Sequence, residues 1–114
     1  VQTLKEMDQY APRGEEGHIF IAAIDGCSAN IALIREGSTD QASGQPIPDF
    51  GSMVVEYIQK KLNGEVIEEG PVVQEGALWS PAQLVMTDVG FQLYLSTTDI
   101  SIDNIDNPGL WGNQ

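Results

Sequence analysis

The sequence has few of the residues from which many functional sites are built. Its 114 residues include one cysteine, Cys27, and one histidine, His18. A single cysteine forms no internal disulfide, which favours a reducing compartment. One cysteine and one histidine also provide no set of zinc ligands. We therefore expect a cytoplasmic protein with no metal site and no cofactor.

Basic residues are scarce as well. Five Lys and Arg residues stand against 17 Asp and Glu residues, and the formal net charge is −12. A nucleic acid backbone attracts clusters of basic side chains. Only Lys60 and Lys61 are adjacent. The charge balance therefore argues against binding of DNA or RNA.

Long apolar runs are missing too. The longest run, residues 19–24, is far shorter than the ~20 residues that span a bilayer. The first residues, Val1–Glu6, lack the charged and then apolar order of a signal peptide. We therefore expect no membrane association, and export is disfavoured.

The composition is nevertheless that of a folded protein. Apolar residues make up 41% of the chain and charged residues 19%, which is enough apolar material for one core. A chain of this length fits one domain better than two. We expect residues 1–114 to form a single compact domain.

Two segments have helical patterns. Thr3 and Glu6 have capping-box spacing, which predicts a short N-terminal helix. A longer amphipathic helix is predicted over 49–63, with Asp49 as its N-cap and Asn63 at its end. Its apolar residues recur at intervals of three and four: Phe50, Met53, Val54, Tyr57, Ile58 and Leu62.

The remaining segments suggest strands. Residues 18–25 and 27–36 are predicted to form a hairpin, joined at Asp25-Gly26 because this pair suits a two-residue turn. A polar loop, mobile or ligand-binding, is expected over 37–48. Five further stretches are predicted to be strands: 65–69, 72–74, 83–89, 91–97 and 100–103. The tail that follows, residues 104–114, is expected to be only partly ordered.

The expected fold class is α+β. An antiparallel sheet of about five strands, made of the N-terminal hairpin and a C-terminal meander, would carry the helix 49–63 on one face. One such helix and a short one cannot cover both faces of this sheet. Another copy of the chain, in a dimer, or a different partner would cover the rest.

The C-terminal segment offers one pattern that could indicate a cation-binding loop. Asp99, Ser101 and Asp103 occupy positions one, three and five of an EF-hand-like run. The sixth position, however, is Asn104 instead of glycine, and the twelfth is Leu110 instead of glutamate. An edge strand with solvated carboxylates explains these residues better.

Catalytic patterns are also missing. The chain has no phosphate-binding glycine loop and no nucleophile elbow. In the predicted hairpin, Cys27 and His18 lie more than ~20 Å apart, too far for a nucleophilic pair. Cys27 is then a small apolar residue, and His18 is packed or at the surface. We expect no catalytic residues, and a binding protein is favoured over an enzyme.

The charge distribution suggests the first function. Residues 1–61 hold nine acidic and five basic residues, whereas residues 62–114 hold eight acidic residues and no basic one. Such asymmetry can steer a basic partner, although it could also serve solubility alone. We expect an acidic non-enzymatic binding or regulatory module acting through protein–protein contact. The candidate partner-binding residues are Glu65, Glu68, Glu69, Trp79 and Trp111, since tryptophan is frequent at binding hot spots.

The alternative is a small-molecule-binding domain. An aromatic-lined pocket between helix and sheet would use Tyr57, Phe91 and Tyr94 as ligand-binding residues, with Trp79 nearby. The same aromatic residues could instead belong to the core.

Overall fold

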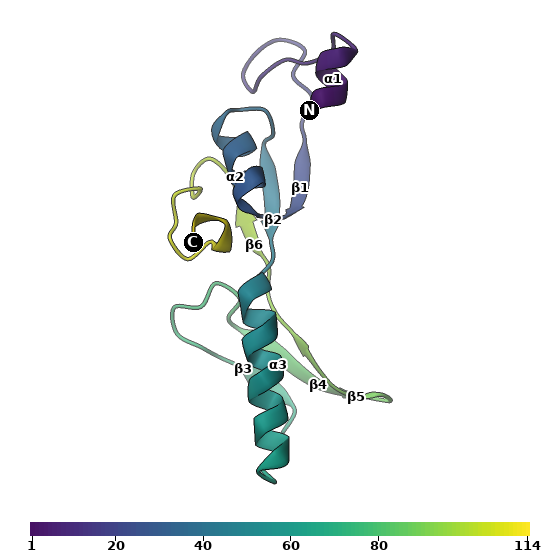
Figure 1. Cartoon of the computed structure of the whole chain (residues 1–114), viewed down its shortest axis with the longest axis vertical. Helices are drawn as coiled ribbons and strands as arrows, with labels where there is room; N and C mark the ends of the chain where they lie inside the picture. The colour runs from purple at the N-terminus through teal and green to yellow at the C-terminus, as the bar shows by residue number, and fades with distance from the viewer. The chain divides into compact units, whose positions relative to one another are not determined.

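The computed structural model describes all 114 residues, and the chain divides into two compact units (Figure 1). Unit 1 consists of Val1–Gln45 together with Thr98–Gln114, and unit 2 is Pro46–Thr97. The sequence predicted one sheet, whereas each unit has a sheet of its own. None of the helices has the length and apolar character needed to cross a membrane.

Unit 1 is built on a mixed three-stranded sheet. Strand β1 (Ala22–Asp25) pairs in parallel with β2 (Gln41–Gly44), and β2 pairs antiparallel with β6 (Thr98–Ile100). Parallel neighbours need a crossover connection, which helix α2 (Ser28–Arg35) provides. The short helix α1 (Gln2–Glu6) begins the chain.

The predicted N-terminal hairpin is wrong, because its second segment is helix α2. Cys27, Ile31 and Ile34 are spaced by four and three residues, which is the stripe of a helix. Ile31 and Ile34 are buried on that stripe. Asp25-Gly26 does turn the chain through positive φ angles, but the turn leads into a helix.

The predicted polar loop 37–48 is also wrong, since it contains β2 and the start of the next helix. The composition of β2, Gln-Ala-Ser-Gly, conceals a strand because its buried positions need very small residues. Ala42 lies opposite Ile100 and is fully buried. A Cβ at Gly44 would meet the Ile100 side chain within 3.1 Å. The close approach of β2 and β6 therefore selects residues that look loop-like.

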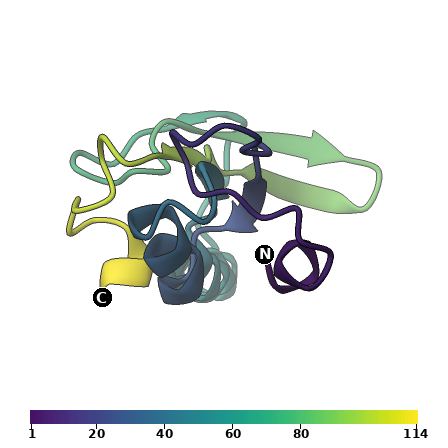
Figure 2. The same ribbon diagram turned by 90° about the horizontal axis from the view of Figure 1, so that it is seen from above.

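The C-terminal tail completes the core of unit 1. Its last residues form a 3-10 turn, η1 (Trp111–Asn113), which lies beside α2 in Figure 2. Although we expected this tail to be only partly ordered, it contributes Ile105 and Leu110 to the buried apolar set. The full set is Ile31, Ile34, Ala42, Ile100, Ile105 and Leu110.

Unit 2 contains the long helix and an antiparallel sheet. Helix α3 (Ile47–Leu62) confirms the predicted helix and begins two residues earlier, because proline is well suited to the first turn. Asp49 lies in that first turn, whereas Pro46 occupies the N-cap. The sheet joins β3 (Gly70–Val72), β4 (Ala82–Thr87) and β5 (Gly90–Tyr94) in that order.

The strand predictions hold in part. The segments 83–89 and 91–97 correspond to β4 and β5, whereas 65–69 is not a strand. The predicted strand 100–103 is replaced by β6, which ends at Ile100 and joins the other sheet. The single sheet of about five strands is therefore wrong, and the coarser α+β class is correct.

The helix at the N-terminus is confirmed, but its predicted capping box is wrong. No side chain caps α1. The amide of Gln2 instead donates a hydrogen bond to the Glu6 carboxylate across one turn, at 3.0 Å. Such an i,i+4 pair on an exposed surface stabilises a helix only slightly.

Candidate functional site

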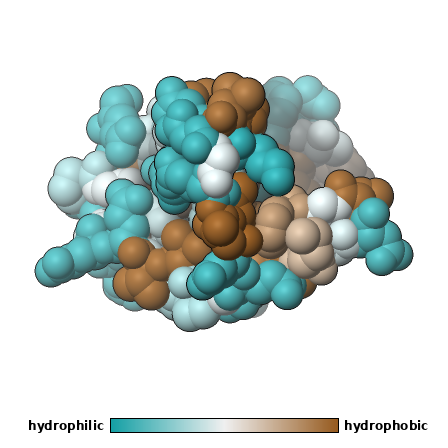
Figure 3. Space-filling model, turned by 90° about the horizontal axis from the view of Figure 1, so that it is seen from below, coloured by the Kyte–Doolittle hydropathy of each residue, from teal (hydrophilic) through white to brown (hydrophobic).

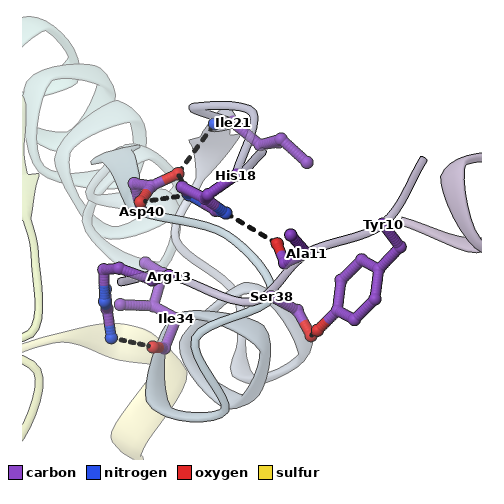
Figure 4. A network of polar contacts seen from close by, with 8 residues as sticks. All are labelled: Tyr10, Ala11, Arg13, His18, Ile21, Ile34, Ser38 and Asp40. Atoms are coloured by element: carbon purple, nitrogen blue, oxygen red, sulfur yellow. Dashed lines mark hydrogen bonds and ion pairs between the residues drawn. The ribbon is translucent and has the colours of Figure 1, made fainter. Parts of the chain in front are cut away.

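A polar network fastens the N-terminal segment of unit 1 to the rest of that unit (Figure 4). Tyr10 Oη and Ser38 Oγ are 2.8 Å apart, and an Arg13 guanidinium nitrogen donates to the Ile34 carbonyl oxygen at 2.9 Å. The backbone N–H of Ile21 donates to the Asp40 carboxylate at 2.8 Å. These contacts join residues 10–21 to the end of α2 and to the segment before β2.

His18 is the centre of this network. Its Nδ1 lies 2.8 Å from the Ala11 carbonyl oxygen, and its Nε2 lies 2.9 and 3.0 Å from the two Asp40 oxygens. Both partners only accept hydrogen bonds, so both ring nitrogens can donate only when the imidazole is protonated. Accordingly, the bond to Ala11 and then the bond to Asp40 raise the pKa of His18 above its ordinary 6.5. This arrangement is an ion pair that holds His18 against the segment before β2.

The second polar cluster lies at the opposite, carboxyl ends of β1 and β2. The carbonyl oxygen of Asp25 accepts the backbone N–H of Gln45 at 3.1 Å and the indole Nε1–H of Trp111 at 2.7 Å. Three residues that are distant in sequence therefore meet at one oxygen atom. We call Asp25, Gln45 and Trp111 the strand-end cluster.

The backbone at the strand-end cluster is tightly constrained. Asp25 has φ +91°, which non-glycine residues rarely adopt and which typically costs about 1–3 kcal/mol. Gly26 follows with φ +70°, and a Cβ there would lie 2.5 Å from Ile100 Cδ1 and 3.0 Å from Gly44 Cα. Contacts with β2 and β6 thus hold the strained turn in place.

The polar groups of the strand-end cluster are available to a ligand. Asp25 is exposed, its carboxylate makes no hydrogen bond or ion pair, and the side-chain amide of half-buried Gln45 is likewise unpaired. Cys27 next to the cluster donates to Asn30 Oδ1 at 3.5 Å. No group of three or more His, Cys, Asp or Glu side chains could hold a metal ion.

Unit 2 contains an apolar cavity of about 590 Å³ between α3 and its sheet. Of the three predicted ligand-binding residues, Tyr57 and Phe91 line the cavity. Tyr94 does not; it is exposed, and its hydroxyl donates to Gln92 Oε1 at 2.6 Å. The complete lining is Phe50, Met53, Val54, Tyr57, Ile58, Lys61, Ile67, Leu84, Phe91, Leu93 and Leu95.

The structure separates the predicted partner-binding residues. Glu65, Glu68 and Glu69 are all exposed in the segment that precedes β3. Glu69 also has a structural contact, because its Oε1 accepts the Met86 N–H at 2.6 Å. Trp79 is only 2% exposed and packs with Met53 and other apolar residues in the core of unit 2. This burial removes Trp79 from any partner-binding surface.

The hypothesis of a cation-binding loop at Asp99–Asp103 is not supported by the hydrogen bonds of these residues. Asp99 accepts a hydrogen bond from Gln41. The Ser101 N–H donates to Asn104 Oδ1 at 2.9 Å, while the Asn104 amide donates to the Asp99 carbonyl oxygen at 2.7 Å. These residues close a turn on themselves.

Asp25 and Gln45 were missed as candidate site residues. A strand–helix–strand reading of residues 22–44 would have found them, because it places the residues after both strands at one sheet edge. Comparison with known proteins adds no assignment: no protein-family model matches the chain, and the search of curated proteins found no match.

Proposed function

We propose that the protein is a small-molecule-binding protein and that unit 1 takes its ligand at the strand-end cluster. One observation carries the proposal: Asp25, Gln45 and Trp111 converge on a single carbonyl oxygen at the carboxyl ends of two parallel strands. In open sheets with parallel strands, ligands bind outside these strand ends. The strained Asp25 is consistent with a site, since such strain gathers where chains bind ligands.

The available groups favour a neutral, hydroxyl-rich ligand such as a sugar or a polyol. The Asp25 carboxylate accepts hydrogen bonds from hydroxyl groups, and the Gln45 amide both donates and accepts. Because the indole N–H of Trp111 is already bonded to Asp25, the ring has only its apolar surface to offer, which suits the C–H groups of a sugar ring.

Charge disfavours an anionic ligand at the strand-end cluster. The two arginines of unit 1 are engaged elsewhere, Arg13 with the Ile34 carbonyl oxygen and Arg35 with Asp106. No basic side chain is therefore paired with the Asp25 carboxylate, and the chain as a whole is strongly acidic.

Titration with a panel of monosaccharides and polyols, followed by calorimetry and by Trp111 fluorescence, tests the proposal. Asp25→Asn keeps a residue that tolerates positive φ but removes the charge. It should weaken binding about tenfold or more, since a hydrogen bond to a charged group is worth about 1.5–3 kcal/mol. Asp103→Asn is the matched control, because it makes the same charge change at an exposed position of unit 1 and should leave affinity unchanged.

Two results would overturn this proposal. One is the absence of saturable binding by any member of the panel. The other is unchanged affinity in Asp25→Asn. Selective binding of amines in place of neutral hydroxyl compounds would show that the ligand class is wrong.

Binding of a basic protein is a second proposal, and the exposure of Glu65 and Glu68 favours it. Residues 62–114 contain eight acidic side chains and no basic one. Capture of a basic protein should then weaken with added salt and in the double variant Glu65→Gln/Glu68→Gln. Retention that is independent of salt would contradict this proposal, and the acidity would then serve solubility.

A further inference from the structure

The apolar cavity of unit 2 is a second, separate candidate for ligand binding. We propose that it binds one amphipathic molecule with a hydrocarbon chain and an anionic head, of the class of medium-chain fatty acids. This proposal does not depend on the strand-end cluster, since every lining residue belongs to unit 2.

The walls of the cavity indicate a hydrocarbon occupant. Ten of its eleven lining residues are apolar or aromatic. Met53 and Leu84 are buried, whereas four lining residues remain 36–59% exposed: Phe50, Val54, Ile58 and Phe91. Figure 3 shows hydrophobic surface, coloured brown, open to solvent between hydrophilic areas. Apolar surface that stays exposed in this way usually marks a binding site.

The size of the cavity suits one small ligand. Its volume of about 590 Å³ falls in the range of roughly 300–1,000 Å³ that is usual for small-molecule sites. The cavity is formed by one face of α3, by the strands β4 and β5, and by Ile67 and Leu95 outside these elements. A single flexible chain could therefore lie along the helix between these two walls.

Lys61 indicates the charge of the head group. It is the only charged residue of the lining, it is exposed, and it makes no ion pair. Its neighbour Lys60 instead pairs with Glu56 at 2.6 Å and does not line the cavity. Lys61 can therefore bind a carboxylate at the mouth of the cavity, where it also offsets repulsion by the acidic chain.

Calorimetric titration with hexanoate, octanoate and decanoate tests the hydrocarbon part. Each buried methylene should tighten binding about fourfold until the cavity is full. Decanoate should therefore bind more than tenfold more tightly than octanoate. Titrations stay below the concentration at which the ligand forms micelles.

The head group is tested with decanol and decylamine as comparison ligands and with two matched lysine variants. Lys61→Gln should weaken decanoate binding about fivefold or more and leave decanol binding unchanged. Lys60→Gln, next in sequence but outside the cavity, should leave both unchanged. Ile58→Glu, at a lining position that is half exposed, should abolish decanoate binding and keep the fold.

Each contrary outcome overturns a defined part of the proposal. Absence of saturable decanoate binding, or binding only to vesicles, refutes a site for a single ligand. Equal affinity for decanol and decanoate, with no effect of Lys61→Gln, refutes the anionic head. Preference for decylamine over decanoate refutes the anionic head and shows that the site selects a cationic head group.

Discussion

Gly112 offers a direct test of how the strand-end cluster is assembled. An ideal Cβ at this position would lie 2.8 Å from the carbonyl carbon of Cys27 and 2.8 Å from Ile31 Cδ1, and closer still to the Gly26 carbonyl oxygen. Ordinary contacts between such atoms are about 3.5–4.0 Å. Gly112→Ala should therefore push the C-terminal turn away from the loop after β1 by about 1 Å.

The energetic effect follows from which atoms would have to move. Two of the three contacts are with backbone atoms, which cannot rotate aside as a flexible side chain can. Overpacking of this kind costs about 1–3 kcal/mol. Losing the hydrogen bond from Trp111 to the Asp25 carbonyl oxygen adds about 0.5–1.5 kcal/mol. Unit 1 should thus lose about 1.5–4.5 kcal/mol of unfolding free energy.

The assay uses urea unfolding in a Trp79→Phe background, in which the remaining Trp111 reports on unit 1. Gly51→Ala in α3 is the control, because nothing lies within 4 Å of its new Cβ. Alanine is favoured over glycine inside a helix by about 0.5–1 kcal/mol, so the control should not destabilise unit 2 and should leave the Trp111 transition of unit 1 unchanged. If Gly112→Ala changes the stability of unit 1 by less than about 0.5 kcal/mol, the described contact between tail and loop is refuted.

Three further predictions concern the interior of each unit. The His18–Asp40 pair should stabilise unit 1 most between about pH 4 and 6.5. Its contribution should fall as pH rises through the raised pKa of His18. It should also fall as pH drops through the pKa of Asp40. Burial raises the pKa of Asp40, but the hydrogen bonds from Ile21 and His18 outweigh burial and lower this pKa below 3.8. Unfolding measured from pH 3 to 9 checks this, and His18→Gln should flatten the profile; an unchanged profile would contradict the assignment. Trp79→Phe should cost unit 2 less than about 1.5 kcal/mol, against about 3–5 for Trp79→Ala, because the buried Nε1 of Trp79 has no hydrogen-bond partner to lose. A large loss in the Phe variant, seen by circular dichroism, would mean that this N–H is paired. Ile100→Ala should lower the unfolding free energy of unit 1 by about 2–5 kcal/mol, since Ile100 is fully buried. Ile102→Ala, at an exposed position, should lower it only slightly. Equal losses in the two variants would contradict the burial of Ile100 in the core of unit 1.

The parts of the fold that could be predicted are those in which several local signals agree. Helix α3 combines an apolar stripe, a proline in its first turn and the Glu56–Lys60 pair. Strand β5 follows the alternation of Phe91 and Leu93 with Gln92 and Tyr94, and Leu93 lies opposite Leu84 of β4 in register. In each case the local sequence preference and the tertiary packing favour the same structure.

Prediction failed where packing between distant segments decides the structure. Asp25-Gly26 suits a hairpin turn, but the close contacts of Gly26 with Ile100 and Gly44 are what place it, and β6 lies more than seventy residues further along the chain. The same contacts require small residues in β2, so its composition resembles that of a loop. Because the predicted hairpin hid the parallel pairing, Asp25 and Gln45 were not expected to share an edge.

The pairing of β2 with β6 has a consequence for how the chain could be divided. Gly44 lies opposite Thr98, and Pro46–Thr97 forms unit 2. The whole of unit 2 is therefore an insertion within one antiparallel strand pair, whose two ends already stand next to each other. If unit 2 were excised and the strands were joined by a tight turn, the loop between them would be halved in length about four times. Its entropic cost of closure would then fall by about 2.5 kcal/mol. The two candidate sites thus lie one in the unit that contains this strand pair and one in the segment inserted into it.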